Sequence, residues 1–301
     1  MAVTAMRNPK VTLNMIPRDQ IVGLENHRVL LVGQKTSAGS ASAGLVRDLP
    51  RTAAEINTLF GAGSMLAMIA RAFRDVNQYT AVDAIVLADN GTTKATSVLT
   101  SSGTATENKS IYVDVVSSQN HSYKVDCVVG ETPATFTAKL RALTALDGNK
   151  PFADAKSTVS VTDDTVTFTA NNAGTHANNW LIRIRDQFGN PGAVAGLAFT
   201  LTGWTGGATD PTLTTALDPT ENIRYHGVVW PSTYATTVVK SWINARFNLD
   251  NDIKDGVVFQ YVADTYSNVK TAALSMNSPS FVMMTNETMN TAYWKGPHLP
   301  E

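Results

Sequence analysis

The chain has 301 residues, of which 43% are hydrophobic, so it can form one large or two medium domains with a sizeable core. Its net charge is −1 and it has no block of Lys or Arg, which argues against nucleic acid as a partner because phosphate binding needs clustered basic side chains. Only 16% of the residues are charged, against about 25% in typical soluble domains. This composition fits two interpretations equally: a surface that is buried against neighbouring proteins, or a β-rich domain with threonine on its outer faces.

The single cysteine, Cys127, excludes an internal disulfide and a cysteine-based metal site. It lies in an alternating strand pattern at residues 123–129, which predicts a small structural residue. No apolar run approaches the roughly 18 residues that a membrane-spanning helix needs. The first 20 residues lack the apolar run of a signal peptide. We therefore expect a protein that is made and kept in a reducing cytosol until lysis releases it.

Residues 1–25 differ from the rest of the chain. A short strand pattern at residues 11–16 is followed by Pro17, and no partner strand is close in sequence. Two interpretations remain open: a frayed terminus, or an arm that pairs with a sheet edge elsewhere, including one on another subunit.

An alternation of strands and helices begins at residue 28. Residues 28–33 and 83–88 are typical of buried strands, and a capping box from Thr52 to Glu55 predicts a short helix between them. Ser64 is expected to cap a second helix. Its apolar stripe comprises Leu66, Ile69, Ala70, Phe73 and Val76. The order strand, helix, strand predicts parallel pairing through a right-handed crossover.

The middle of the chain is different in character. Residues 92–106 are almost all small or polar and have the composition of a linker. From residue 111 to about 202 strands dominate, with one helix that starts at Thr132 and Pro133. The predicted strands are residues 111–116, 123–129, 158–162, 165–169, 180–184 and 197–201. Asp163 and Asp164 fall between two of them and are interpreted as a hairpin turn rather than a carboxylate pair.

After glycines at 203, 206 and 207 the first pattern resumes. A short helix is expected at Asp210-Pro211 and a longer one after Ser232, followed by a helix over residues 265–274. Strands are expected at residues 225–229, 256–262 and 280–284. The predicted fold is an α/β (α+β) core domain with a mixed sheet, interrupted by a β-rich insertion domain, with an extended N-terminal arm. The predicted boundaries are 1–25 for the arm, 26–105 with 205–301 for the discontinuous core, and 106–204 for the insertion.

The sequence carries no strong chemical motif. Lys35 and Thr36 follow a strand, but the earlier glycine of a phosphate loop is absent. Asp250, Asp252 and Asp255 resemble part of a calcium loop whose glycine comes too late and whose glutamate is missing. No histidine has a second ligand four residues on; the histidines are His27, His121, His176, His226 and His298. We predict no catalytic residue, no metal and no cofactor.

An α/β enzyme with scattered catalytic residues remains a remote alternative. Such an enzyme would place ionisable groups after its parallel strands, at the carboxyl edge of the sheet. The predicted strands are followed by Gly33-Gln34, by Ala88-Asp89-Asn90 and by Trp230-Pro231-Ser232. Asp89 alone is not a site.

The order of segments resembles the contractile tail sheath proteins of myophages, in particular the Mu-like group. Each motif is weak, and their shared order over about residues 15–285 is the specific part. The stretches that carry the resemblance are residues 16–34, 62–88, 166–180 (with its Gly174-Thr175 turn), 206–231 and 277–282.

The resemblance implies a structural, non-enzymatic subunit that forms a helical or stacked-ring homo-oligomer around a tail tube. The sheath then shortens and drives the tube through the host envelope. It also implies tail tube, baseplate and tail terminator proteins as partners, with assembly in the host cytoplasm and a final place in the virion tail. Another virion or secretion-apparatus component, such as a cap or baseplate protein, is the nearer alternative.

In that family terminal arms add strands to neighbouring subunits, and Val11, Leu13, Met15 and Ile16 match the arm. Family members continue into a further C-terminal domain and arm, whereas residues 295–301 look like a connector. We therefore expect the C-terminal part of the core to be missing here. We expect the insertion to face outward, because linkers at both ends should return it to one spot on the core.

Overall fold

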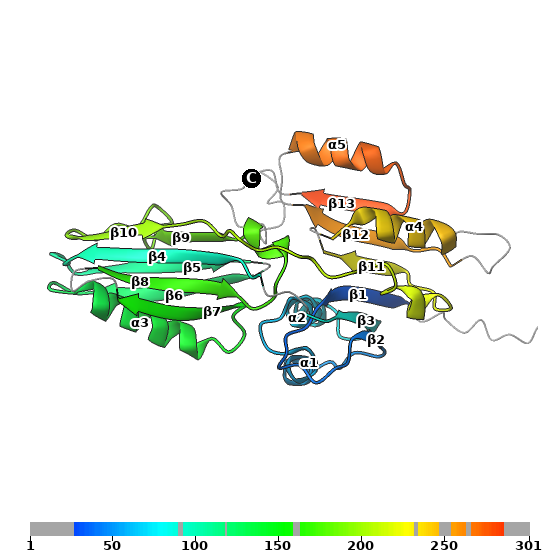
Figure 1. Cartoon of the computed structure of the whole chain (residues 1–301), viewed down its shortest axis with the longest axis horizontal. Coiled ribbons are helices and arrows are strands. Elements are labelled where there is room, and N and C mark those ends of the chain that lie inside the picture. The colour runs from blue at the N-terminus through cyan, green and yellow to red at the C-terminus, as the bar shows by residue number, and fades with distance from the viewer. Residues whose placement is uncertain are drawn as a thin grey trace, which may run out of the picture.

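The computed structural model describes residues 27–89, 93–117, 119–158, 163–231, 234–246, 254–262 and 266–285. These residues form three sheets, shown in Figure 1. One has six strands in the order β13-β12-β11-β1-β3-β2. A second has the order β10-β4-β8-β7, and a third the order β6-β5-β9. The fold class is thus mixed α/β, as the sequence predicts. The predicted N-terminal arm lies outside the described residues.

The six-stranded sheet is built from two distant parts of the chain. β1 (Arg28–Gln34) pairs in parallel with β3 (Ala81–Leu87) on one side and with β11 (Gly227–Trp230) on the other. β12 (Val257–Val262) and β13 (Phe281–Thr285) extend the parallel order, whereas β2 (Gly44–Val46) pairs antiparallel with β3. The predicted parallel pairing and the mixed sheet are both confirmed.

Helices cover both faces of this sheet. On one face, Leu31, Val82 and Ala84 pack against α1 (Ala53–Phe60) and α2 (Met65–Val76). On the opposite face, Leu30, Val228 and Val258 pack against α4 (Thr236–Arg246) and against residues 213–225. α5 (Tyr266–Met276) contacts β13. We call these the α2 face and the α4 face.

Local signals set the helix starts. The side chains of Thr52, Ser64 and Thr132 each accept a hydrogen bond from the backbone amide three residues later, as N-caps do, so these three predicted caps are confirmed. The cap predicted at Ser232 lies outside the described residues. The apolar stripe predicted for α2 is wrong at its end, because Val76 is 90% exposed. Arg71 and Arg74 are buried instead. Arg74 reaches that position by donating to backbone carbonyls, which removes the cost of burying its polar groups.

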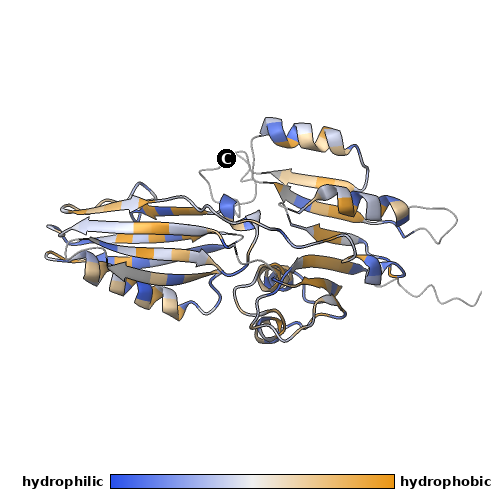
Figure 2. Cartoon of the chain, in the orientation of Figure 1, coloured by the Kyte–Doolittle hydropathy of each residue, from blue (hydrophilic) through white to orange (hydrophobic). Residues whose placement is uncertain are grey.

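The β-rich part of the chain packs two sheets and one helix around a shared apolar core. The four-stranded sheet contains β4 (Thr96–Gly103), β7 (Phe152–Thr158), β8 (Asp163–Ala170) and β10 (Leu197–Leu201). The three-stranded sheet contains β5 (Lys109–Val116), β6 (Asn120–Cys127) and β9 (Leu181–Arg185). α3 (Pro133–Leu146) contributes Phe136 and Leu140 to a core that includes Phe152, Phe168 and Trp204. Figure 2 shows the alternating hydropathy along these strands.

Three sequence predictions in this region are wrong. Residues 92–106 are not a linker, because 96–103 form strand β4 between β8 and β10. Its small buried hydroxyls are paired, with Ser97 donating to the Thr202 carbonyl at 2.6 Å. Asp163 and Asp164 are not a turn, because both lie in β8. Asp164 is buried and accepts from the Thr137 hydroxyl at 3.0 Å.

The third error is the helix expected at Asp210-Pro211. That segment has no helix, and a short 3-10 helix occurs later at Asp218–Thr220. The Asp210 carboxylate binds Thr175, 35 residues away, in place of capping a local helix. The division of the chain into arm, core and insertion domains stays a prediction.

Candidate functional site

Residues 171–176, which we call the clamp loop, lie against the carboxyl ends of β1 and β3. Asn172 is buried and makes two hydrogen bonds to the six-stranded part. Its Oδ1 accepts from the amide of Met65 at 2.8 Å, and its Nδ2 donates to the Lys35 carbonyl at 2.9 Å. The Met65 amide opens α2 and has no partner within its helix. Asn172 therefore supplies hydrogen-bond partners both to the first amide of α2 and to the carbonyl of the residue that follows β1.

The next residue, Ala173, binds the polar side chains that follow the two central strands. Its amide donates to Asp89 Oδ1 at 2.9 Å, and its carbonyl accepts from Gln34 Nε2 at 3.0 Å. Gln34 ends β1 and Asp89 follows β3. One backbone unit of the clamp loop thus binds both the Asp89 carboxylate and the Gln34 amide nitrogen, whereas Gln34 Oε1 has no hydrogen-bond partner among the described residues.

Asn171 joins two loops of the molecule. Its Nδ2 donates to the carbonyls of Gly63 and Lys150 at 3.3 and 3.0 Å, and its own carbonyl accepts from Lys94 Nζ at 2.6 Å. Gly63 has a φ of 70°, and a Cβ there would lie 2.0 Å from the Lys150 carbonyl oxygen. Only glycine fits this close approach. The turn between α1 and α2 is therefore held against the loop between α3 and β7.

His176 ends the clamp loop in a largely buried position beside Trp180. Burial lowers its pKa to about 4, against the opposing charge of Asp210. Asp210 accepts from the Thr175 amide at 2.8 Å and from the Thr175 hydroxyl at 2.7 Å. The imidazole is therefore neutral at pH 7, and its Nδ1 has no hydrogen-bond partner within the described part of the chain.

The two ends of the β-rich part meet next to the clamp loop. Thr96 and Thr205 exchange backbone hydrogen bonds of 2.8 and 3.0 Å. Asn178 and Gly207 exchange two further bonds of 2.9 Å each. The entry and exit of this part are thus fixed at one place.

In an open α/β sheet, ligands bind in the crevice at the carboxyl ends of the strands. Here the clamp loop contacts those ends at β1 and β3. At the end of β11, Trp230 is buried and its Nε1 donates to the Tyr234 carbonyl at 3.4 Å. The arrangement is suited to fixing one part of the molecule on the other.

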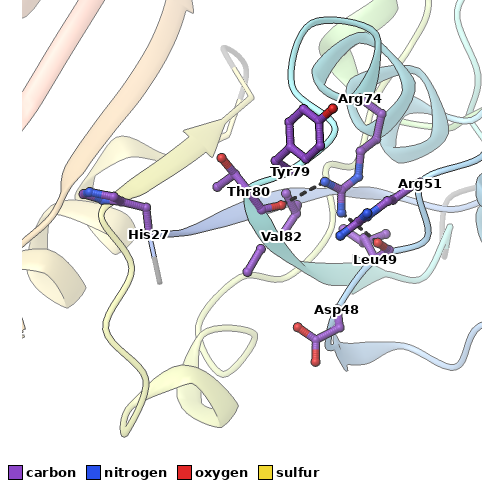
Figure 3. A pocket seen from close by; sticks show the side chains of 9 residues that line it. His27, Asp48, Leu49, Arg51, Arg74, Tyr79, Thr80 and Val82 are labelled. Atoms are coloured by element: carbon purple, nitrogen blue, oxygen red, sulfur yellow. Dashed lines mark hydrogen bonds between the residues drawn. The ribbon is translucent and has the colours of Figure 1, made fainter. Parts of the chain in front are cut away.

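A polar groove of about 570 Å³ lies at the opposite, amino edge of the sheet (Figure 3). Arg74 points into it but donates to the carbonyls of Leu49, Thr80 and Pro50 at 2.7, 2.9 and 3.2 Å. Burial lowers the pKa of this guanidinium. Arg74 therefore holds the groove wall together.

The remaining candidate groups have structural roles. Lys35 Nζ donates to the Gly39 carbonyl at 2.9 Å, as a local loop contact. His27 and His226 stack edge to face with ring centroids 4.4 Å apart. The residues that the structure describes hold no group of three His, Cys, Asp or Glu side chains that could bind a metal. Burial raises the pKa of Cys127 to about 11, as fits a buried structural thiol.

No helix within the described ranges is long and apolar enough to cross a membrane. The sequence-predicted arm residues, Val11, Leu13, Met15 and Ile16, fall outside those ranges. Sequence reasoning did not find the clamp contacts, although residues 166–180 were among the stretches that carried the resemblance. Asn171-Asn172 followed by Gly174 was the available signal, because side-chain amides can bind two backbone groups at once.

The described residues form an α/β sheet to which the β-rich part is attached at the carboxyl ends of β1 and β3. Comparison with known proteins gives a family resemblance. The chain is 27% identical over 274 residues to the Mu-like prophage FluMu tail sheath protein of Haemophilus influenzae. The match covers 89% of this chain and 53% of that protein, so the chain spans about half of its relative's length. The resemblance to Mu-like tail sheath proteins is confirmed.

A solved structure, the sheath tail protein of Desulfitobacterium hafniense, aligns with 95% of this chain and 56% of its own. The identity is 12% and the TM-score is 0.32, which is too low for its fold to be transferred. No family model matches the chain.

Proposed function

We propose that this chain is a structural subunit of a phage contractile tail sheath, which polymerises around the tail tube and shortens to drive the tube through the host envelope. The observation that carries the proposal is the sequence similarity to a tail sheath protein along 89% of the chain. The subunit has no catalytic role and needs no cofactor.

The position of the clamp loop at the carboxyl ends of β1 and β3 supports a structural role over an enzymatic one. A sheath subunit must transmit force, and a β-rich part tied down by Asn171, Asn172 and Ala173 moves with the six-stranded sheet. An enzyme at this edge would need free ionisable groups, whereas the Asp89 carboxylate accepts from the Ala173 amide.

The proposed partners are further copies of the chain, the tail tube protein, and the baseplate and tail terminator proteins. The low fraction of charged residues favours burial of its surface against such neighbours. Its proposed place is the virion tail, after assembly in the host cytoplasm. A cap or baseplate component of a virion or secretion apparatus is the alternative, and it would form closed rings.

The arm is proposed to tether neighbouring subunits. Val11, Leu13, Met15 and Ile16 would add a strand to a sheet edge of the next copy. Backbone hydrogen bonds of this kind hold subunits together while their bodies rotate.

The β-rich part is proposed to face outward on the assembled tube. Its ends meet at Thr96 and Thr205, so it can be removed by joining residues 95 and 206. A folded deletion variant should still form tubes, and loss of all tubes would refute this placement.

Sedimentation velocity of the purified chain at increasing concentration tests the proposal. We expect growing polymers that Leu13→Asp abolishes. Asn14→Asp is the matched control, because alternate residues of a strand point to opposite sides. A full-length protein that stays monomeric at high concentration would contradict the sheath function. Closed rings of fixed size would favour the cap or baseplate alternative.

A further inference from the structure

Three polar side chains form one row across the outer side of the three-stranded sheet. The register places Arg183 of β9 and Ser122 of β6 on either side of Asp114 of β5. The neighbours of Asp114 along β5, Val113 and Val115, belong to the apolar core, so the row lies on the opposite side of the sheet. Asp114 is nevertheless fully buried, because other side chains of this outer side cover it.

Two guanidinium groups cover the Asp114 carboxylate. Arg183 Nε donates to Oδ2 at 3.0 Å, and Arg185 Nε donates to the same oxygen at 2.6 Å. The Ser122 hydroxyl donates to Oδ1 at 2.6 Å. The cluster therefore sets two positive charges against one negative charge, and one positive charge is left uncompensated.

The uncompensated group is the guanidinium of Arg183. Arg185 is fully engaged, because its Nη1 and Nη2 donate to the Asp186 carbonyl and to the Ser122 hydroxyl at 3.3 and 3.1 Å. Arg183 Nη1 and Nη2 make no hydrogen bond to the residues that the structure describes, and the Arg183 side chain is 33% exposed. Its Nε is thus fixed on Asp114 while its two terminal nitrogens keep the fork geometry that binds a carboxylate with two hydrogen bonds.

The surrounding groups favour a carboxylate on a protein over a phosphate chain or a sugar. Lys124 and Asp126 of β6 bind each other at 3.0 Å, so they do not extend the excess charge into the basic cluster that a phosphate chain needs. The ring of Tyr112, which would otherwise stack on a sugar, lies under the Arg185 guanidinium with 4.5 Å between the guanidinium carbon and the ring centroid.

We propose that Arg183 is a docking site for an acidic side chain of another protein, with its two terminal nitrogens on the carboxylate and Leu181 packing beside it. Leu181 lies two residues before Arg183 on the same side of β9 and is 36% exposed. β9 is an outer strand of its sheet. Asp114 acts as a positioning residue, because it fixes the guanidinium before the partner arrives and so reduces the entropy lost on binding. The inference goes beyond the proposed function and does not rest on it.

Isothermal titration calorimetry of the 301-residue chain with poly-L-glutamate tests the proposal, at low salt and at a protein concentration where sedimentation shows monomers. We expect Arg183→Gln to weaken binding about tenfold or more, because hydrogen bonds to a charged group are lost. Arg183→Lys keeps the charge without the fork and should also bind more weakly. Arg47→Gln is the matched control, because it removes the same charge from an exposed arginine, and it should change the affinity less than about twofold.

Thermal unfolding identifies any variant that fails to fold. Arg183→Lys keeps the test valid if Arg183→Gln unfolds, because lysine still supplies a positive charge beside Asp114. The proposal is overturned if Arg183→Lys binds as tightly as the unsubstituted chain, if Arg183→Gln matches Arg47→Gln, or if the unsubstituted chain does not bind polyglutamate. Polygalacturonate is the comparison probe, because its carboxylates belong to a polysaccharide. If it binds at Arg183 more tightly than polyglutamate does, the site belongs to a sugar acid and the protein partner is ruled out.

Discussion

Asn172 is the residue on which the attachment of the β-rich part most depends. Its side chain is 2% exposed and bonds the first amide of α2 and the carbonyl of Lys35. Neither backbone group has an alternative partner supplied by its own element, since one opens a helix and the other follows a strand. Loss of the amide would leave both unsatisfied.

Asn172→Ala should lower the free energy of unfolding by about 2–4 kcal/mol, because each buried group left unpaired costs about 1–3 kcal/mol. Asn149→Ala is the control: Asn149 lies at the same junction and accepts from Asn57, but it is exposed. Its loss should cost less than about 1 kcal/mol. Urea unfolding of both variants measures the difference. Equal losses of unfolding free energy would show that the hydrogen bonds of Asn172 do not stabilise the junction.

His176 makes the clamp sensitive to acid. Its pKa of about 4 in the folded chain is below the ordinary value of 6.5, so the unfolded chain binds a proton more readily. Stability from this group is complete above pH 6.5 and is lost as the pH falls toward 4.

Between pH 7 and 4.5 this effect amounts to about 2–3 kcal/mol of unfolding free energy. His176→Gln should remove that part of the pH dependence. Denaturant titrations at both pH values give the comparison. An unchanged pH dependence in the variant would contradict a role for His176.

The caps at Thr52, Ser64 and Thr132 were predictable, because a cap and its amide lie three residues apart. The clamp was not. Asn172 meets Met65 across 107 residues, and Thr175 meets Asp210 across 35. Pairings of this length leave no local pattern in one sequence.

At the scale of elements, one buried carboxylate ties three segments of the six-stranded sheet. Asp83 on β3 accepts from Arg28 of β1 at 2.5 Å, from the Asp48 amide at 2.9 Å and from the Tyr225 hydroxyl at 2.8 Å. Burial raises the pKa of Tyr225, and the Asp83 carboxylate adds to the shift. The parallel strands β1 and β3 and the entry to β11 thus share one polar centre.

Asp83→Ala should destabilise the chain by about 2–4 kcal/mol, because it leaves the buried Tyr225 hydroxyl and the Asp48 amide unpaired beside a charged guanidinium. Asp48→Asn is the matched control, because Asp48 has a φ of 51°, which asparagine tolerates and alanine does not. It removes a second carboxylate that also binds Arg28, at 3.0 Å, but the Asp48 side chain is 74% exposed. An exposed pair contributes about 0–1 kcal/mol. Thermal unfolding of the two variants compares the stability that each carboxylate contributes. Similar losses of stability would contradict a stabilising role for the buried Asp83 carboxylate.

Strands with a continuous apolar or alternating pattern, such as β1, β5 and β12, were predictable from sequence. β4 was missed because its serines and threonines read as a linker, whereas its pairing with β8 and β10 turns them into strand residues. Asp164 was misplaced for a similar reason. Its buried partner, Thr137, lies on α3, and nothing near Asp164 in sequence indicates it.

At the scale of the whole molecule, the described residues form two packed bodies joined at one place. The six-stranded sheet comes from residues 28–87 and 227–285, and the β-rich part from the strands between them. The clamp loop and the Thr96–Thr205 bridge lie at the junction. Under the proposed function, such a subunit would change its contacts with neighbours while its own two parts stay fixed to each other.

Negative-stain electron microscopy of the chain with and without residues 1–25 tests the sheath account most directly. The account predicts long hollow tubes for the 301-residue chain and dispersed particles after the arm is removed. Tubes that persist without the arm would contradict a sheath lattice held together by strand exchange. Dispersed particles in both samples would contradict it if they also form from a chain of the relative's full length, of which this chain spans about half.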